Sequence, residues 1–125
     1  MSQEETEIRA VIRTYFEGMH EASAEKTRAA FRPQARITGY LPDGLASLDV
    51  ESFAGLCARL QPSPAARGDA ERLDVLSVEI AGATAVARVR DDYDGNTFLD
   101  TLTFLRDADG WRIHDKLFHV EGPAG

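Results

Sequence analysis

The second half of the sequence contains four apolar stretches separated by short turns, and this spacing constrains the fold most. The stretches cover residues 72–80, 84–93, 96–106 and 111–120. The segments between them, "AGA", "DG" and "DADG", are typical of β-hairpin turns. Strands joined by consecutive hairpins form an antiparallel meander. The sequence therefore predicts a four-stranded antiparallel sheet in this half.

The first half has the periodicity of helices. Residues 4–20 place apolar side chains on one helical face, and a second helix is expected from Ser23, a favourable N-cap, to Phe31. Residues 35–40 predict a strand and residues 41–44 a turn, after which Asp49 caps a third helix. Residues 61–69 break the periodicity and predict an exposed loop. Helices first and strands last indicate an α+β fold with the helices on one face of a curved sheet.

Length and charge narrow the function classes. The chain has 125 residues with 43% apolar content, which fits a single domain over 1–125. A net charge of -7 disfavours nucleic acids and anionic membranes as partners, because both are bound through clustered Lys and Arg. The acidic N-terminus and the lack of a long apolar run predict a cytoplasmic protein. A small molecule or a protein is the expected partner.

Cysteine and histidine usage argues against a metal or a cofactor. The single cysteine, Cys57, excludes an internal disulfide and a cysteine-rich zinc site, and its place on an apolar stripe indicates a core thiol. His20 closes the first helix, where a cation interacts favourably with the helix dipole. No spacing forces His20, His114 and His119 together. No metal site and no cofactor are therefore expected.

Asp100 is the least ordinary residue of the predicted sheet. In residues 96–106 the even positions are Phe98, Asp100, Leu102 and Phe104, and this apolar row must point inward. An inward carboxylate must be neutral, hydrogen-bonded, paired or facing a wet cavity. Two interpretations remain open: Asp100 belongs to a pocket, or it pairs with Arg88 or Arg90 on the neighbouring strand.

Several motifs together resemble a known superfamily. They are "YFEGMH" in the first helix, "FRPQARITG" after the second, "LDVESF" at the third, and the final "LDTLTFLRDADGWRIHDKLFH". The order of these motifs along the chain resembles that of the nuclear transport factor 2-like superfamily. Within the superfamily it is most similar to the putative lumazine-binding proteins, relatives of the SnoaL-like polyketide cyclases. The resemblance implies a cone-shaped, cystatin-like α+β fold in which a strongly curved antiparallel sheet wraps three N-terminal helices and encloses a pocket. Members of the superfamily include enzymes, ligand binders and structural dimers.

Ketosteroid isomerase offers a comparison within this superfamily. It uses a tyrosine of its first helix and a protonated aspartic acid of a later strand as oxyanion donors, and a second aspartate as base. Tyr15 and Asp100 match the two donors by position. The base would fall at Gly39, and neither it nor its neighbours Thr38 and Tyr40 is a carboxylate. The resemblance therefore implies a donor pair without isomerase activity; the alternative is that the Tyr15 hydroxyl is a satisfied buried donor outside any site.

The last strand, "WRIHDKLFHV", holds two histidines, an aspartate and a lysine. On strict alternation Trp111 and Ile113 face inward, and Asp115 and His119 follow them. His114 would then face the solvent. A β-bulge after Ile113 would instead turn Lys116, Phe118 and Val120 inward.

The opposite face of the sheet carries apolar residues as well. Leu99, Leu105 and, on strict alternation, Phe118 would lie there among Thr and Arg residues, and an exposed apolar patch on a sheet usually meets a partner. Relatives commonly pair sheet to sheet, so a homodimer through the outer face is expected.

Three functions remain open. The leading hypothesis is a small-molecule-binding protein whose partly aromatic organic ligand lies under the first helix. The second is a lyase, cyclase or isomerase in which Tyr15 and Asp100 bind an enolate-like oxygen and His119 or His20 accepts the proton. The third is a non-catalytic dimeric interaction module. The expected pocket residues are Tyr15, Phe31, Tyr40, Phe98, Asp100, Trp111 and His119, with Tyr15, Asp100 and His119 as the catalytic candidates.

Overall fold

Ten helices and strands build the protein in the order α1 (Gln3–His20), α2 (Ala24–Ala30), β1 (Phe31–Leu41), β2 (Gly44–Asp49), α3 (Val50–Arg59), α4 (Pro64–Arg67), β3 (Leu73–Ala81), β4 (Thr84–Tyr93), β5 (Asn96–Asp107) and β6 (Gly110–Pro123). The computed structural model describes residues 1–125. The three expected helices and the four strands of the meander are present, and the α+β class is confirmed. None of the helices is both long and apolar enough to cross a membrane.

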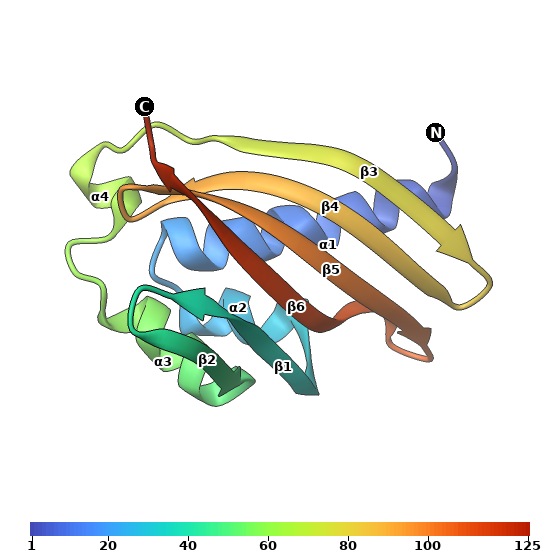
Figure 1. Cartoon of the computed structure of the whole chain (residues 1–125). Helices are drawn as coiled ribbons and strands as arrows, with labels where there is room; N and C mark the ends of the chain where they lie inside the picture. Colours follow the sequence, from blue (N-terminus) through green and yellow to red (C-terminus); the bar gives the residue numbers. More distant parts are fainter.

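The six strands form one sheet in the order β2-β1-β6-β5-β4-β3. All neighbouring strands are antiparallel except β1 and β6, which run parallel. Figure 1 shows the sheet curving around α1, α2 and α3, which all lie on one of its faces. The concave inner face therefore meets the helices, and the outer face is left uncovered.

Hydrogen-bonding side chains fix where the helices begin. Ser2, Ser23 and Asp49 each accept a hydrogen bond from a backbone N–H three residues ahead, at the starts of α1, α2 and α3. The expected caps at Ser23 and Asp49 are thus confirmed. The chain passes directly from α2 into β1 at Phe31, the residue at which the second helix was expected to end.

Two elements differ from the sequence-based expectation. Residues 44–49 form strand β2, which pairs with β1 through a tight turn. Residues 64–67, inside the expected loop, form the one-turn helix α4, which Ser63 caps. Neither segment is long enough to show a hydrophobic period.

One hydrophobic core of 19 buried residues lies between the helices and the inner face of the sheet. Ile8, Ile12 and Phe16 of α1 are at most 1% exposed and contribute the helical side. Leu102 and Phe104 of β5 and Ile113 of β6 contribute the sheet side and are equally buried.

Candidate functional site

A cavity of about 240 Å³ lies between the inner face of the sheet and the helices. Its mouth is bordered by Leu41 and Leu56, which are 41% and 50% exposed. Most of its lining is apolar, and the polar exceptions include Asp91 and Lys116. The full lining is Met19, Ile37, Leu41, Ala46, Leu48, Phe53, Leu56, Asp91, Tyr93, Asp94, Asn96, Phe98, Lys116 and Phe118.

Asp91 is the buried acid of the cavity wall. It continues the inward row of β4 after Ala85, Ala87 and Val89, and only 1% of its surface is exposed. Neither of its side-chain oxygens accepts a hydrogen bond. Burial raises the pKa of Asp91 well above its usual range, and the nearby Asp100 carboxyl raises this pKa further. Asp91 therefore holds its proton to a higher pH than an exposed aspartate does.

Lys116 brings a cation to the same wall. It is 5% exposed, and its Nζ lies 4.5 Å from the ring centre of Phe53 and 4.8 Å from that of Tyr15. Each of these rings is within cation–π distance. Lys116 makes neither a hydrogen bond nor an ion pair within 4.0 Å. Its ammonium is therefore held by aromatic faces and by the more distant carboxyls.

Tyr15 and Asp100 form a buried pair beside Lys116. The Tyr15 hydroxyl donates a hydrogen bond of 2.6 Å to Oδ2 of Asp100, and Oδ1 of Asp100 has no partner. Burial raises the pKa of Asp100, whereas Lys116 and the Tyr15 hydroxyl oppose that rise. Burial likewise raises the pKa of Tyr15. The tyrosine hydroxyl is therefore committed to Asp100, and the pairing of Asp100 with Arg88 or Arg90 is wrong.

Strand register explains why these groups meet. Val89 pairs with Asp100, and Asp100 pairs with Phe118, so Asp91 and Lys116 are diagonal neighbours of Asp100 on the same face. Diagonal neighbours across a sheet lie about 7–8 Å apart, within reach of long side chains. Asp91, Asp100 and Lys116 therefore form one cluster on β4, β5 and β6. The Tyr15 ring packs against the Lys116 ammonium of this cluster.

The expected pocket residues separate into three groups. Phe98 lines the cavity. Tyr15, Phe31, Asp100 and Trp111 are buried but do not line it: the Phe31 ring packs edge-on against Tyr15 at 5.8 Å, and Trp111 packs against Arg106 near the β5–β6 turn. The remaining two residues, Tyr40 and His119, are exposed on the outer face.

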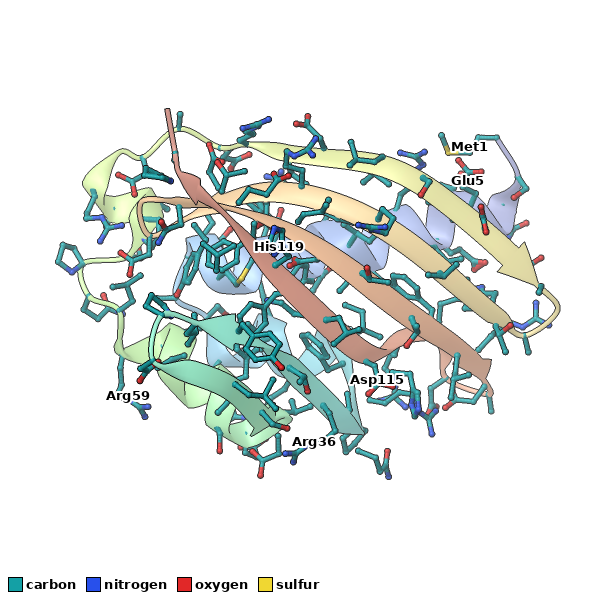
Figure 2. The ribbon with its side chains drawn as sticks, in the orientation of Figure 1. Met1, Glu5, Arg36, Arg59, Asp115 and His119 are labelled. Carbon is teal, nitrogen blue, oxygen red and sulfur yellow. The ribbon has the colours of Figure 1, made fainter.

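A β-bulge explains the position of His119. Thr103 pairs with Asp115 and Phe104 pairs with Ile113, so His114 is an extra residue on β6. The bulge reverses the alternation, which turns Lys116 inward and His119 outward. Figure 2 shows Asp115 and His119 on β6, on the face of the sheet away from the helices. The inward placement of Asp115 and His119 from strict alternation is wrong, and the alternative with a bulge is confirmed.

Gly39 occupies the position that the comparison with ketosteroid isomerase assigns to a catalytic base. A Cβ atom added there would lie 2.5 Å from Cδ1 of Phe118, far inside contact distance. The Phe118 ring lies against this bare backbone and forms part of the cavity wall. The Phe118 ring therefore occupies the space that a side chain at position 39 would need.

The three histidines lie apart from the cavity. His20 stacks on Phe16 with ring centres 5.3 Å apart, His114 forms the bulge, and His119 is exposed. No group of three or more His, Cys, Asp or Glu side chains is arranged to hold a metal ion. Cys57 is buried, and burial raises the pKa of its thiol.

Comparison with known proteins identifies the family. Residues 3–119 match the sequence profile of the family described as putative lumazine-binding. The chain belongs to the putative lumazine-binding family. This family lies within the nuclear transport factor 2-like superfamily, and the fold neighbours agree with that placement.

Solved structures and one curated protein resemble this putative lumazine-binding protein. A nuclear transport factor 2-like protein from Shewanella baltica is 27% identical, with a TM-score of 0.84 over 98% of this chain and 96% of its own. Another from Silicibacter pomeroyi, 22% identical, has a TM-score of 0.83 over 97% of this chain and 100% of its own. Both are described as being of unknown function. The aldolase FrzH of a Cladobotryum species is 28% identical over 91% of each chain.

Asp91 was not among the expected pocket residues, and Lys116 was expected inside only with a bulge after Ile113, yet each had a signal in the sequence. The row Ala85, Ala87, Val89 continues in register to Asp91, so the same parity argument that identified Asp100 also places Asp91 inside. For Lys116 the signal is a change of parity along β6, because the apolar positions are odd at its start and even at Phe118. Such a change within one strand of this family member indicates a bulge.

Proposed function

We propose that the protein binds a small, mainly apolar and partly aromatic molecule that carries one carbonyl or similar polar group. One observation carries this proposal: the apolar cavity contains a buried acid, Asp91, whose two oxygens have no protein partner, beside the unpaired Lys116. Buried polar groups ordinarily have hydrogen-bond partners, so a ligand group that satisfies both residues would gain affinity and a fixed orientation.

The cavity volume limits the size of the ligand. At about 240 Å³ it is smaller than the roughly 300–1,000 Å³ typical of sites for drug-sized compounds. Compounds with one ring or a short branched chain therefore fit best. Apolar side chains around the wall would contact the hydrocarbon part, and Asp91 and Lys116 would contact the oxygen.

Binding can be tested by ligand-observed NMR with benzaldehyde, cyclohexanone and lumazine. We expect the two apolar carbonyl compounds to bind more tightly than lumazine, because the many polar atoms around the lumazine rings would meet apolar walls. Ala46→Phe, which fills the cavity from β2, should abolish binding, whereas Leu45→Phe on the opposite face of β2 should leave it intact. Equal binding by both variants, or no binding of either carbonyl compound, would contradict the proposal.

An enzyme acting on a carbonyl compound is the second candidate. Burial raises the pKa of Asp91 well above its usual range, and general acids and bases work best when their pKa is near the operating pH. The 28% identical relative is named an aldolase. Proton transfer at the carbon next to a carbonyl is common to aldol chemistry, so Asp91 would be the proton carrier.

In this enzyme, Tyr15 and Asp100 act as a pair behind the cavity wall. Their mutual hydrogen bond would orient the carboxyl that faces Lys116, and Tyr15 would support the ammonium through its ring. His119 is too exposed for the role of proton acceptor, and His20 does not line this cavity. Asp91 takes that role in the proposal.

Hydrogen–deuterium exchange at the α-carbons of cyclohexanone in D₂O tests the enzymatic candidate. The protein should accelerate this exchange, and Asp91→Asn should remove about 10²-fold or more of the acceleration. Exchange no faster than in buffer would exclude proton transfer at this site. Only the proposed ligand binding, measured by NMR, would then remain.

We also propose that the outer face of the sheet pairs with a second copy of the chain. Leu117, Tyr40 and Leu45 are 57%, 72% and 62% exposed, and strand pairing places Leu117 beside Thr38 and Tyr40 beside Leu45. These residues form an apolar outer patch across β6, β1 and β2. Large exposed apolar patches mark interaction sites, and a twofold axis would bury the same patch on both subunits.

A further inference from the structure

Lys116 is one of only two lysines in the chain, and the two have opposite surroundings. Lys26 is on the surface and forms ion pairs with Glu17 at 3.0 Å and Glu21 at 2.9 Å. Lys116 is 5% exposed, lines the cavity, and has no carboxylate within ion-pair distance. The exposed Lys26 therefore serves as a control for any chemistry of the buried Lys116 amine.

The structure supplies no partner that would hold the Lys116 amine away from a ligand. Its Nζ is surrounded by the rings of Phe53, Tyr15 and Phe118 at 4.5, 4.8 and 5.7 Å from their centres. Aromatic faces attract the ammonium but accept no proton from it. A ligand that enters past Leu41 and Leu56 meets this nitrogen on the cavity wall.

Two carboxyl groups lie within the same cluster. Asp91 has both oxygens free, and Asp100 has one free oxygen and one held by Tyr15. A lysine in an apolar pocket beside a proton carrier is the arrangement by which enzymes form Schiff bases with carbonyl substrates. The cavity itself selects small apolar compounds.

We propose that Lys116 Nζ forms a Schiff base with a small apolar aldehyde or ketone bound in the cavity, with Asp91 carrying the protons. This inference rests on the proposed binding function and names the covalent chemistry of that site. It assigns Lys116 as the nucleophile, Asp91 as the acid and base, and the Tyr15–Asp100 pair as positioning residues.

The reaction needs no reagent beyond the carbonyl compound. When Asp91 is ionised, it accepts one proton from the Lys116 ammonium, and the nitrogen lone pair then forms a bond to the carbonyl carbon while the C=O π electrons move to oxygen. Asp91 protonates that oxygen, takes a proton from nitrogen, and protonates the hydroxyl again as it leaves. One ammonium and one carbonyl thereby become one iminium ion and one water, with no change of oxidation state.

Reductive trapping tests the proposal on the intact protein. The wild type is incubated with benzaldehyde or cyclohexanone, reduced with sodium cyanoborohydride and mapped by peptide mass spectrometry. We expect the adduct on Lys116 to exceed that on Lys26 and on the N-terminal amine at least tenfold, and to saturate with the concentration of the carbonyl compound. Lys26→Arg should retain the Lys116 adduct. Asp91→Asn should slow its formation about 10²-fold.

The contrary outcomes separate the two proposals. If NMR shows the carbonyl compounds bound in the cavity but the adduct is absent from Lys116 or spread equally over all amines, the Schiff base is excluded and the binding function stands. If neither binding nor an adduct is observed, both are excluded. Lys116→Arg, checked for folding by circular dichroism, removes the amine and should abolish the saturable adduct; a saturable adduct of undiminished yield in this variant would overturn the assignment.

Discussion

The Tyr15 hydroxyl donates a 2.6 Å hydrogen bond to Oδ2 of Asp100 and so joins helix α1 to the middle of strand β5. Both side chains are at most 1% exposed. This bond is a buried polar connection between the helical layer and the sheet, and it holds the ring of Tyr15 over Lys116. The same contact therefore contributes to stability and to the geometry of the cavity.

Loss of this hydroxyl should destabilise the protein. Tyr15→Phe leaves Oδ2 of Asp100 buried without a partner, and a buried unsatisfied acceptor costs about 1–3 kcal/mol. Urea denaturation should show a lower free energy of unfolding for this variant. Tyr40→Phe, at a position 72% exposed, is the matched control and should be neutral.

The double variant sharpens this test. When Asp100→Leu is added to Tyr15→Phe, the orphaned carboxyl is gone, and apolar groups replace both partners. Part of the lost stability should return. A double variant less stable than Tyr15→Phe would show that Asp100 contributes through contacts other than the tyrosine.

The sheet could be predicted from the sequence because alternation and hairpin turns are local signals. Residues 84–93 and 96–106 have these signals, and they form β4 and β5 as expected. The inward position of Asp100 followed from the same parity, and its exposed fraction is 0%. The α+β architecture was therefore encoded in short-range patterns.

The cluster of Asp91, Asp100 and Lys116 could be predicted only in part, because the inward position of Lys116 depends on the inserted residue His114. Trp111 and Ile113 face inward whether or not His114 forms a bulge, so strict alternation was consistent with both registers. The bulge decides which of Lys116 and His119 reaches the interior. The change of parity at Phe118 indicates a bulge somewhere in β6, but only the pairing with β5 places it at His114.

Gly39 should tolerate no side chain. Gly39→Ala places a Cβ 2.5 Å from both Cδ1 and the backbone oxygen of Phe118, and such overpacking typically costs about 1–3 kcal/mol. Gly55→Ala in α3 is the control, since its Cβ meets only the flexible end of Arg59 at 3.1 Å. That substitution should stabilise the helix by up to about 1 kcal/mol. Thermal denaturation should move in opposite directions for the two variants, and a common direction would contradict this packing.

The outer patch of Leu117, Tyr40 and Leu45 should control the oligomeric state. We expect a dimer in sedimentation velocity and a monomer for Leu117→Arg, because the charge would be buried twice across a twofold axis. Leu76→Arg introduces the same charge at a leucine of β3 that is 48% exposed and should remain dimeric. A monomeric wild type, or equal dissociation by both variants, would exclude this interface.

Asp91 should make stability depend on pH in a defined direction. Below about pH 4 an ordinary aspartate is protonated, so Asp91 carries its proton in both the folded and the unfolded chain. As the pH rises, the unfolded chain releases this proton freely, whereas burial raises the pKa of Asp91 in the folded protein and opposes its ionisation. The contribution of Asp91 to the free energy of unfolding therefore falls with rising pH until the folded-state pKa is passed.

Asp91→Asn should remove this decline. The variant should therefore gain stability relative to the wild type between pH 4 and pH 8, by about 1.4 kcal/mol for each tenfold difference in acidity between the folded and the unfolded state. Urea denaturation across this range measures the difference at each pH. Asp43→Asn, at an exposed turn position, is the control and should show a constant difference. A constant difference for Asp91→Asn as well would mean that the buried carboxyl ionises as readily in the folded protein as in the unfolded chain.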